Sequence, residues 1–250
     1  MKVKGLNMKD FLTDIVAHTH ALGNIKLVKI IGDDTATELE AVADDKSVVV
    51  KAKFHSSNKD FKGTFGMPNL DKLNIILGIP EYKNGSKINL ITEQRNGETV
   101  TSGLHFENER GDFVNDYRFM SMETVNEKLK SVKFKGVNWH VTFEPTVAGI
   151  QRFRFQANAN SEENTFIAKT EKGDLKFYFG DHSTHAGNFV FHSGVTGTLS
   201  KAWSWPVQQF ISILYLDGDK TVQMSNDGAA MITVDSGLIA YQYILPAASK

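Results

Sequence analysis

The chain has 250 residues, with 28 lysines and arginines against 29 aspartates and glutamates, so its formal net charge is -1. This balance gives no overall attraction to nucleic acid or to an acidic membrane, and 41% hydrophobic residues exclude a disordered chain. The sequence has no cysteine, which excludes disulfides, thiolate zinc sites and cysteine nucleophiles, and its length allows two domains.

The N-terminal segment does not have the pattern of a secretory signal. Charged residues interrupt its apolar positions, and no apolar run in the chain approaches the ~18 residues that a membrane-spanning helix needs. We therefore expect a soluble protein of the cytoplasm (the host cytoplasm if the chain is viral) with no membrane partner.

The first half of the chain is predicted to alternate helices and short strands. Apolar residues spaced three and four apart predict helices over residues 8–22 and 69–78. Runs of β-branched and aromatic residues predict strands over 47–54, 87–92, 99–106 and 113–120, with Asn96-Gly97 as a turn. The charged stretch 121–136 has the least strand character in the middle of the chain.

The second half of the chain is also predicted to alternate helices and short strands. Helices are predicted over about 145–157, with Val147, Ile150, Phe153 and Ala157 as the buried stripe, and over 207–215. Strands are predicted over 165–170, 175–179, 188–192, 221–225, 231–235 and 238–245. Three of the four helices begin at or after a proline, where its missing N–H costs little.

Similar spacing of the helices indicates a tandem duplication. The interval from Met8 to Pro68 differs by one residue from the interval between Pro145 and Pro206, and an apolar-x-apolar-Pro sequence ends both intervals. We predict an N-terminal domain over 1–120, a connector over 121–136 and a C-terminal domain over 137–250.

Two segments resemble a known family. The first is VNDYRFM at 114–120, followed by METVNEKL, and the second is YQYILPA at 241–247. Both resemble DNA sliding clamps of the proliferating cell nuclear antigen (PCNA) type, which T4-like phages share. The resemblance implies an α+β clamp fold, with two tandem similar domains that each pack two helices on antiparallel sheets.

The same resemblance implies a function in DNA replication. Three identical subunits would form a ring around duplex DNA, bind it independently of sequence, and tether the replicative DNA polymerase as its processivity factor. An ATP-dependent clamp loader would open and close the ring, and the clamp itself would be no enzyme and need no cofactor. The alternative is a duplicated β-rich viral structural or assembly protein with no role on DNA.

Candidate DNA contacts are the basic residues on the predicted helices, because phosphate contacts position a protein without reading sequence. These residues are Lys9, Lys72, Arg152 and Arg154. Acidic residues on the first two helices oppose them, and ordinary solvated helix faces are the alternative interpretation. Contacts of this kind are few, so we expect weak, salt-sensitive binding.

The resemblance also implies a subunit interface and a groove for partner peptides. Edge strands of neighbouring subunits would pair through 113–120 and 188–192, and the interface candidates are Phe113, Tyr117, Phe119, Phe189 and Phe191. The alternative is that these rings fill the internal core. The groove candidates are Met122, Leu129, Val132, Leu245, Pro246 and Ala247, although the chain lacks the acidic tail of the family. The alternative is that Leu129 and Val132 only hold the connector in place.

No catalytic or metal-binding residue is predicted. The strongest metal-like cluster is Asp181-His182-Ser183-Thr184-His185, and a polar loop between two strands is the better interpretation. The sequence contains neither a P-loop motif nor a G-x-S-x-G nucleophile motif.

Overall fold

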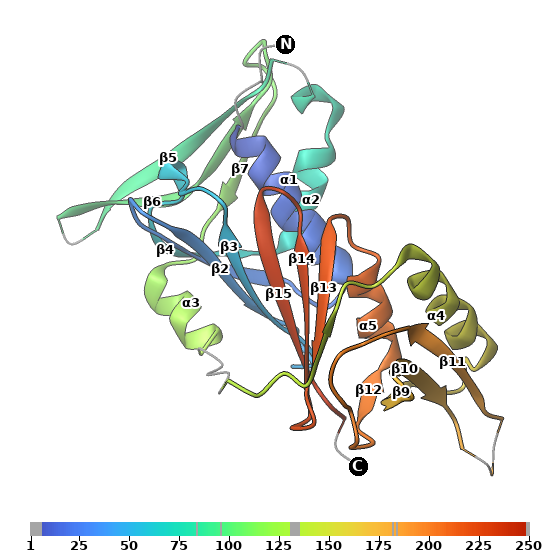
Figure 1. The fold of residues 1–250 in the computed structure, drawn as a ribbon. Coiled ribbons are helices and arrows are strands. Elements are labelled where there is room, and N and C mark those ends of the chain that lie inside the picture. The colour runs from blue at the N-terminus through green and yellow to red at the C-terminus, as the bar shows by residue number, and fades with distance from the viewer. Residues whose placement is uncertain are drawn as a thin grey trace, which may run out of the picture. The chain divides into compact units, whose positions relative to one another are not determined.

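The computed structural model describes residues 7–83, 85–95, 97–130, 136–181, 183 and 185–248 (Figure 1). The chain divides into two compact units. The first comprises Met1–Lys46, Val50–Val132 and Gly237–Tyr241, and the second comprises Ser47–Val49, Lys133–Ser236 and Gln242–Lys250.

The first unit combines helices with two antiparallel sheets. Its helices are α1 (Met8–His18), α2 (Leu70–Gly78) and α3 (Met122–Lys128), with short 3-10 helices at His20–Leu22, Lys59–Phe61 and Pro80–Tyr82. Its strands are β1 (Leu27–Gly32), β2 (Thr37–Val42), β3 (Val49–Phe54), β4 (Gly63–Pro68), β5 (Lys87–Arg95), β6 (Glu98–Glu107) and β7 (Val114–Arg118). The strand orders are β4-β1-β2-β3 and β5-β6-β7.

Helix α1 begins at a capping box and packs its apolar stripe inward. The Asn7 side chain accepts a hydrogen bond from the Asp10 backbone N–H, and the Asp10 carboxylate accepts one from the Asn7 N–H. Within the same unit, the Tyr241 hydroxyl donates to the Asp14 carboxylate at 2.8 Å, and the Tyr241 ring stacks on His18. The segment Gly237–Tyr241 is thereby fixed to α1.

The second unit has two helices and two antiparallel sheets. Its helices are α4 (Val147–Ala159) and α5 (Val207–Leu214). Its strands are β8 (Val141–Phe143), β9 (Thr165–Glu171), β10 (Asp174–Phe179), β11 (Gly187–His192), β12 (Ser204–Pro206), β13 (Asp219–Met224), β14 (Ala229–Asp235) and β15 (Ile239–Pro246). The strand orders are β12-β9-β10-β11 and β15-β14-β13-β8. Residues 239–241 of β15 belong to the first unit, where they continue its sheet beside β3.

The order of elements occurs twice along the chain. A helix, four strands, a second helix and three strands follow one another from α1 to β7 and again from α4 to β15. The strand order β4-β1-β2-β3 of the first repeat matches β12-β9-β10-β11 of the second. The repeated order agrees with the duplication predicted from the helix spacing, whereas the domain boundaries remain a prediction.

All four predicted helices are present, and the differences lie elsewhere. Helix α3 falls in the stretch predicted as a connector, so the first unit has a third helix; Ser121 caps it by accepting from the Thr124 N–H. Five strands were not predicted: β1, β2, β4, β8 and β12. Val147 was predicted to be buried but is 74% exposed, because only Gly149, Phe153 and Ala157 of α4 face inward fully.

Candidate nucleic-acid interface

Helix α4 packs closely on β11 and leaves its opposite face open. Its N-cap is Thr146, whose hydroxyl accepts a hydrogen bond from the Gly149 N–H at 3.0 Å. Gly149 has no Cβ, and one placed there would lie 2.6 Å from the Phe191 carbonyl oxygen. The helix can therefore approach the strand only because this position is glycine, and α5 lies beside it in the same unit (Figure 1).

Both arginines of α4 are exposed and are held by aromatic rings. The Arg152 guanidinium lies 5.5 Å from the centroid of the Phe189 ring, and the Arg154 guanidinium lies 5.4 Å from that of Tyr215. Cation–π contacts of this kind orient a guanidinium without neutralising its charge. Neither α4 nor α5, both fully described, contains an acidic residue, so these two helices carry only positive charge.

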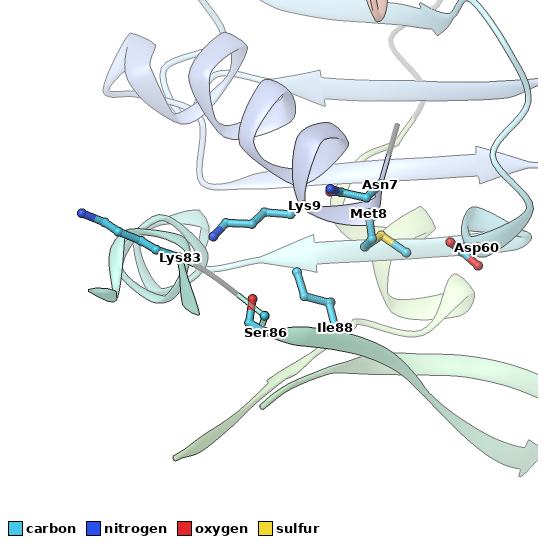
Figure 2. Close-up of a pocket in the computed structure, with 8 residues that line it drawn as sticks. Asn7, Met8, Lys9, Asp60, Lys83, Ser86 and Ile88 are labelled. Atoms are coloured by element: carbon cyan, nitrogen blue, oxygen red, sulfur yellow. The ribbon is translucent and has the colours of Figure 1, made fainter. Parts of the chain in front are cut away.

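The two predicted DNA contacts of the first unit, Lys9 and Lys72, are less available. The Lys9 ammonium donates to the Tyr82 carbonyl oxygen at 2.5 Å, and Figure 2 shows its side chain directed from α1 toward the neighbouring short helix. Lys72 is exposed in the first turn of α2, but Asp71 precedes it and contacts the His20 ring at 2.5 Å. The helices of this unit therefore present mixed charge to solvent.

Most of the predicted interface aromatics lie inside their own units. Tyr117, Phe189 and Phe191 are 2%, 6% and 3% exposed, and the half-buried Phe119 stacks on Phe65 at 4.3 Å. Only Phe113 is exposed, at 41%. Rings that fill a core cannot also contact a second subunit, so the structure favours the core interpretation for the buried side chains. An interface through these strands would have to use their backbone groups.

The two predicted interface strands are edge strands in the part of the chain that the structure describes. β7 ends the sheet β5-β6-β7, and β11 ends the sheet β12-β9-β10-β11. On the β6 side of β7, Phe113 accepts from the Asn108 N–H and the Phe119 N–H donates to Ser102. Because backbone groups alternate along a strand, those of Val114, Asp116 and Arg118 point away from β6.

The predicted groove residues are distributed over both units. Met122, 48% exposed, and the half-buried Leu129 lie at the two ends of α3 in the first unit. Leu245 is completely buried in the second unit, so a partner cannot reach it without a rearrangement, whereas Pro246 is exposed and Ala247 is half-buried. Val132 lies outside the described residues, and the groove stays a prediction.

A pocket of about 470 Å³ lies at the start of α1 in the first unit (Figure 2). Its charged lining residues are Lys9, Lys83 and Asp60. Since the Lys9 ammonium already donates to the Tyr82 carbonyl oxygen, this arrangement does not converge on a ligand position.

One Ser–His–Asp group does come together, around Ser225. The Ser225 hydroxyl donates to the Asn138 carbonyl at 2.7 Å and is 1% exposed, while His140 Nδ1 accepts from the Asn226 N–H at 3.2 Å. A buried hydroxyl whose proton is directed at a carbonyl is not an activated nucleophile, and Asp227 contacts the serine rather than the histidine. The group fixes the turn between β13 and β14.

The described residues include no group of three or more histidines, aspartates or glutamates placed to hold a metal ion. His182 of the predicted metal-like loop lies outside them. None of the described helices is long and apolar enough to cross a membrane.

Burial gives Tyr117 a pH-dependent role in stability. Burial raises the pKa of its hydroxyl, which donates to the Pro68 carbonyl oxygen. Above the ordinary tyrosine pKa of about 10, the unfolded chain loses this proton while the folded chain keeps it, so the free energy of unfolding falls as pH rises.

We expect Tyr117→Phe to cost about 1 kcal/mol at pH 7, through the lost hydrogen bond. Above pH 10 this deficit should shrink by up to about 1.4 kcal/mol per pH unit, because phenylalanine cannot titrate. Urea unfolding at pH 7 and above pH 10 measures both effects. The exposed Tyr215→Phe is the control, and a deficit that stays constant with pH would contradict the assignment.

Comparisons with known proteins agree with this geometry at the level of the fold. No protein-family model matches the chain, and no curated protein sequence matches it. Among solved structures, a chain from the structure of the C-terminal region of FEN-1 bound to A. fulgidus PCNA gives a TM-score of 0.67 at 13% identity. The alignment covers 97% of this chain and 95% of that chain. PCNA from Thermococcus kodakaraensis gives 0.64 at 10% identity, covering 97% and 98%. The chain has the fold of a DNA sliding clamp.

The predicted α+β clamp fold is therefore confirmed over nearly the whole chain. The sequence did not indicate that this clamp fold would expose Phe155 and Tyr215 on its second-unit helices, at 60% and 44%. A signal was present, because Phe155 lies two residues from Phe153 and so on the opposite side of a helix. A count of apolar residues at helical spacing does not separate these two sides.

Proposed function

We propose that this chain is a DNA polymerase processivity clamp, in which copies close into a ring around duplex DNA. The observation that carries the proposal is the clamp fold itself, which matches PCNA over 97% of this chain and at least 95% of the solved chains. The match therefore spans both repeats.

The internal repeat supports a head-to-tail ring. In the first unit, the start of β15 lies beside β3, and the His55 N–H donates to the Leu238 carbonyl oxygen at 3.0 Å. By element order, β11 is the equivalent of β3 and β7 is the equivalent of β15. Since β7 and β11 are edge strands, we propose that β7 of one copy pairs with β11 of the next, which closes a ring by rotation. The resemblance implies three copies.

The charge pattern supports loose, sequence-independent contact with DNA. Arg152 and Arg154 are exposed on helices that carry no acidic residue, whereas Lys9 donates to a carbonyl and Lys72 follows an aspartate. We propose that the second unit makes most phosphate contacts. A ring threaded on DNA needs few of them, because topology rather than affinity retains it.

The partners follow from the same proposal. A. fulgidus PCNA binds the C-terminal region of FEN-1, and we propose that this chain likewise binds a peptide segment of its polymerase. Met122, exposed at the start of α3, is the first candidate contact. An ATP-dependent loader would place the ring on DNA in the cytoplasm, without chemistry by the clamp.

Two measurements test the proposed function. Sedimentation at micromolar concentration should give a mass that is a multiple, expected threefold, of the 27.8 kDa chain. After loading, the ring should stay on closed circular duplex and slide off the same DNA once it is linearised. A strict monomer, or equal retention on both DNA forms, would count against the ring.

We expect Arg152→Ala and Arg154→Ala each to weaken duplex binding and to reduce the slope of log affinity against log salt by about 0.9, as for the loss of one phosphate contact. Lys9→Ala should change the slope much less, because its ammonium already donates to the Tyr82 carbonyl oxygen. Fluorescence anisotropy over a range of salt concentrations measures the slopes. A larger change for Lys9→Ala than for the arginine variants would assign the contact to the first unit instead.

A further inference from the structure

The helix face of the second unit carries an exposed group of two rings and one guanidinium, here called the aromatic patch: Arg154, Phe155 and Tyr215. Phe155 is 60% exposed and Tyr215 is 44% exposed. The Arg154 guanidinium lies 5.9 Å from the centroid of the Phe155 ring and 5.4 Å from that of Tyr215. Exposed apolar groups that lie together, unlike single ones, mark binding surfaces, so the aromatic patch requires an explanation.

The surroundings of the aromatic patch are polar but not acidic. Gln151 and Asn158 lie four residues before and three after Phe155, and therefore on the same side of α4. Gln208 lies seven residues before Tyr215, on the same side of α5, and all three amide side chains are exposed. The helix face thus offers aromatic rings, amides and arginine, with no carboxylate on either helix.

Acidic residues occur only beyond the ends of these helices. Glu162 follows α4, and Asp217 lies two residues after Tyr215; both are exposed. They limit the attraction of the region for a polyanion. A ligand of the aromatic patch must therefore gain most of its affinity from stacking and from amide hydrogen bonds, with the arginines supplying the charge preference.

We propose that the aromatic patch stacks on unpaired bases of single-stranded DNA. Aromatic rings and arginine are the groups that bind single strands without sequence preference, and amides hydrogen-bond exposed base edges. Duplex DNA hides the faces of its bases, so it cannot use the rings. A peptide is the competing occupant, because its backbone also hydrogen-bonds amides, and the polymerase-binding measurement below distinguishes the two. The inference rests on the proposed function for bringing DNA to this face, and it adds recognition of a single-stranded segment beside the duplex.

The test compares single-stranded and duplex DNA by fluorescence anisotropy with the full chain. The probes are a labelled oligothymidylate of roughly 16 nucleotides, near the upper site size of single-strand binders, and a mixed-sequence duplex of the same length. Phe155→Leu and Tyr215→Leu keep the apolar bulk and remove the ring. Each should weaken single-strand binding about tenfold, because losing the stacking of one base lowers affinity by about that factor. Each should change duplex binding less than twofold.

Ile75→Ala is the matched control, because Ile75 is 67% exposed on α2 of the first unit and should have no effect. The proposal is overturned if the wild type does not bind the single strand, if both leucine variants bind it as the wild type does, or if duplex binding falls equally. It is also overturned if Phe155→Leu spares DNA binding but abolishes polymerase binding, since the face would then dock protein. Linear oligonucleotides need no closed ring, so failure of retention on circular duplex would contradict the clamp and not this site.

Discussion

Phe153→Ala is expected to lower the free energy of unfolding by about 3–5 kcal/mol, the range for truncating a fully buried phenylalanine. Phe153 is 0% exposed, and its ring lies 4.9 Å from Phe166, 5.2 Å from Phe177 and 5.9 Å from Phe191, between ring centroids. Alanine would leave a cavity where α4 packs on the central strands β9 and β10 and the edge strand β11. Urea unfolding followed by circular dichroism measures the loss.

The matched control is Phe155→Ala on the same helix. Its ring is 60% exposed, so the same change in composition should cost less than about 1 kcal/mol. Equal losses for the two variants would mean that α4 is rotated about its axis relative to the structure. Because Arg152 and Arg154 flank Phe153, the core variant should also weaken DNA binding.

Asp116→Pro is expected to convert the assembled protein to single chains of 27.8 kDa while each chain stays folded. The Asp116 N–H points away from β6, so proline removes a donor that only a neighbouring strand would use. If β11 of the next copy pairs there, the ladder loses a hydrogen bond and the proline ring blocks close approach. Sedimentation and far-ultraviolet circular dichroism measure mass and fold separately.

Asp116→Ala separates the backbone effect from the side-chain effect. It removes the exposed contacts of the carboxylate with His105 at 2.7 Å and Arg118 at 3.8 Å, which are worth about 0–1 kcal/mol, and it keeps the N–H. Its mass should equal that of the wild type. If the proline variant stays assembled, or if the alanine variant dissociates as fully, pairing through the β7 edge is not what closes the ring.

The sequence predicted helices more completely than strands. α1, α2 and α5 are amphipathic, with buried residues three and four apart, and a cap or proline marks each start. β1 and β2 were missed, although Val28 and Ile30 alternate with half-buried neighbours, because a short alternating strand resembles a loop with scattered apolar residues. Helix α3 was missed because only Val125 among its residues is buried.

The candidate site shows the same limit at the level of single residues. The sequence located Arg152 and Arg154 on a helix, but it did not show that Lys9 would donate to a carbonyl 73 positions away along the chain. It also marked β7 and β11 as aromatic strands. Only their places at the ends of their sheets show that the backbones are available while Tyr117, Phe189 and Phe191 fill cores.

The sequence by itself determined the duplicated architecture, since helix spacing and apolar periodicity are local properties of the chain. It also determined that charge gives no overall attraction to DNA, because net charge is a sum over residues. The tertiary structure decided which strands lie at the edges of sheets and which aromatic rings are buried. It also decided which basic side chains donate to backbone carbonyls, as Lys9 does. These properties depend on contacts between residues far apart in sequence, and no local pattern encodes which of two similar faces meets the core.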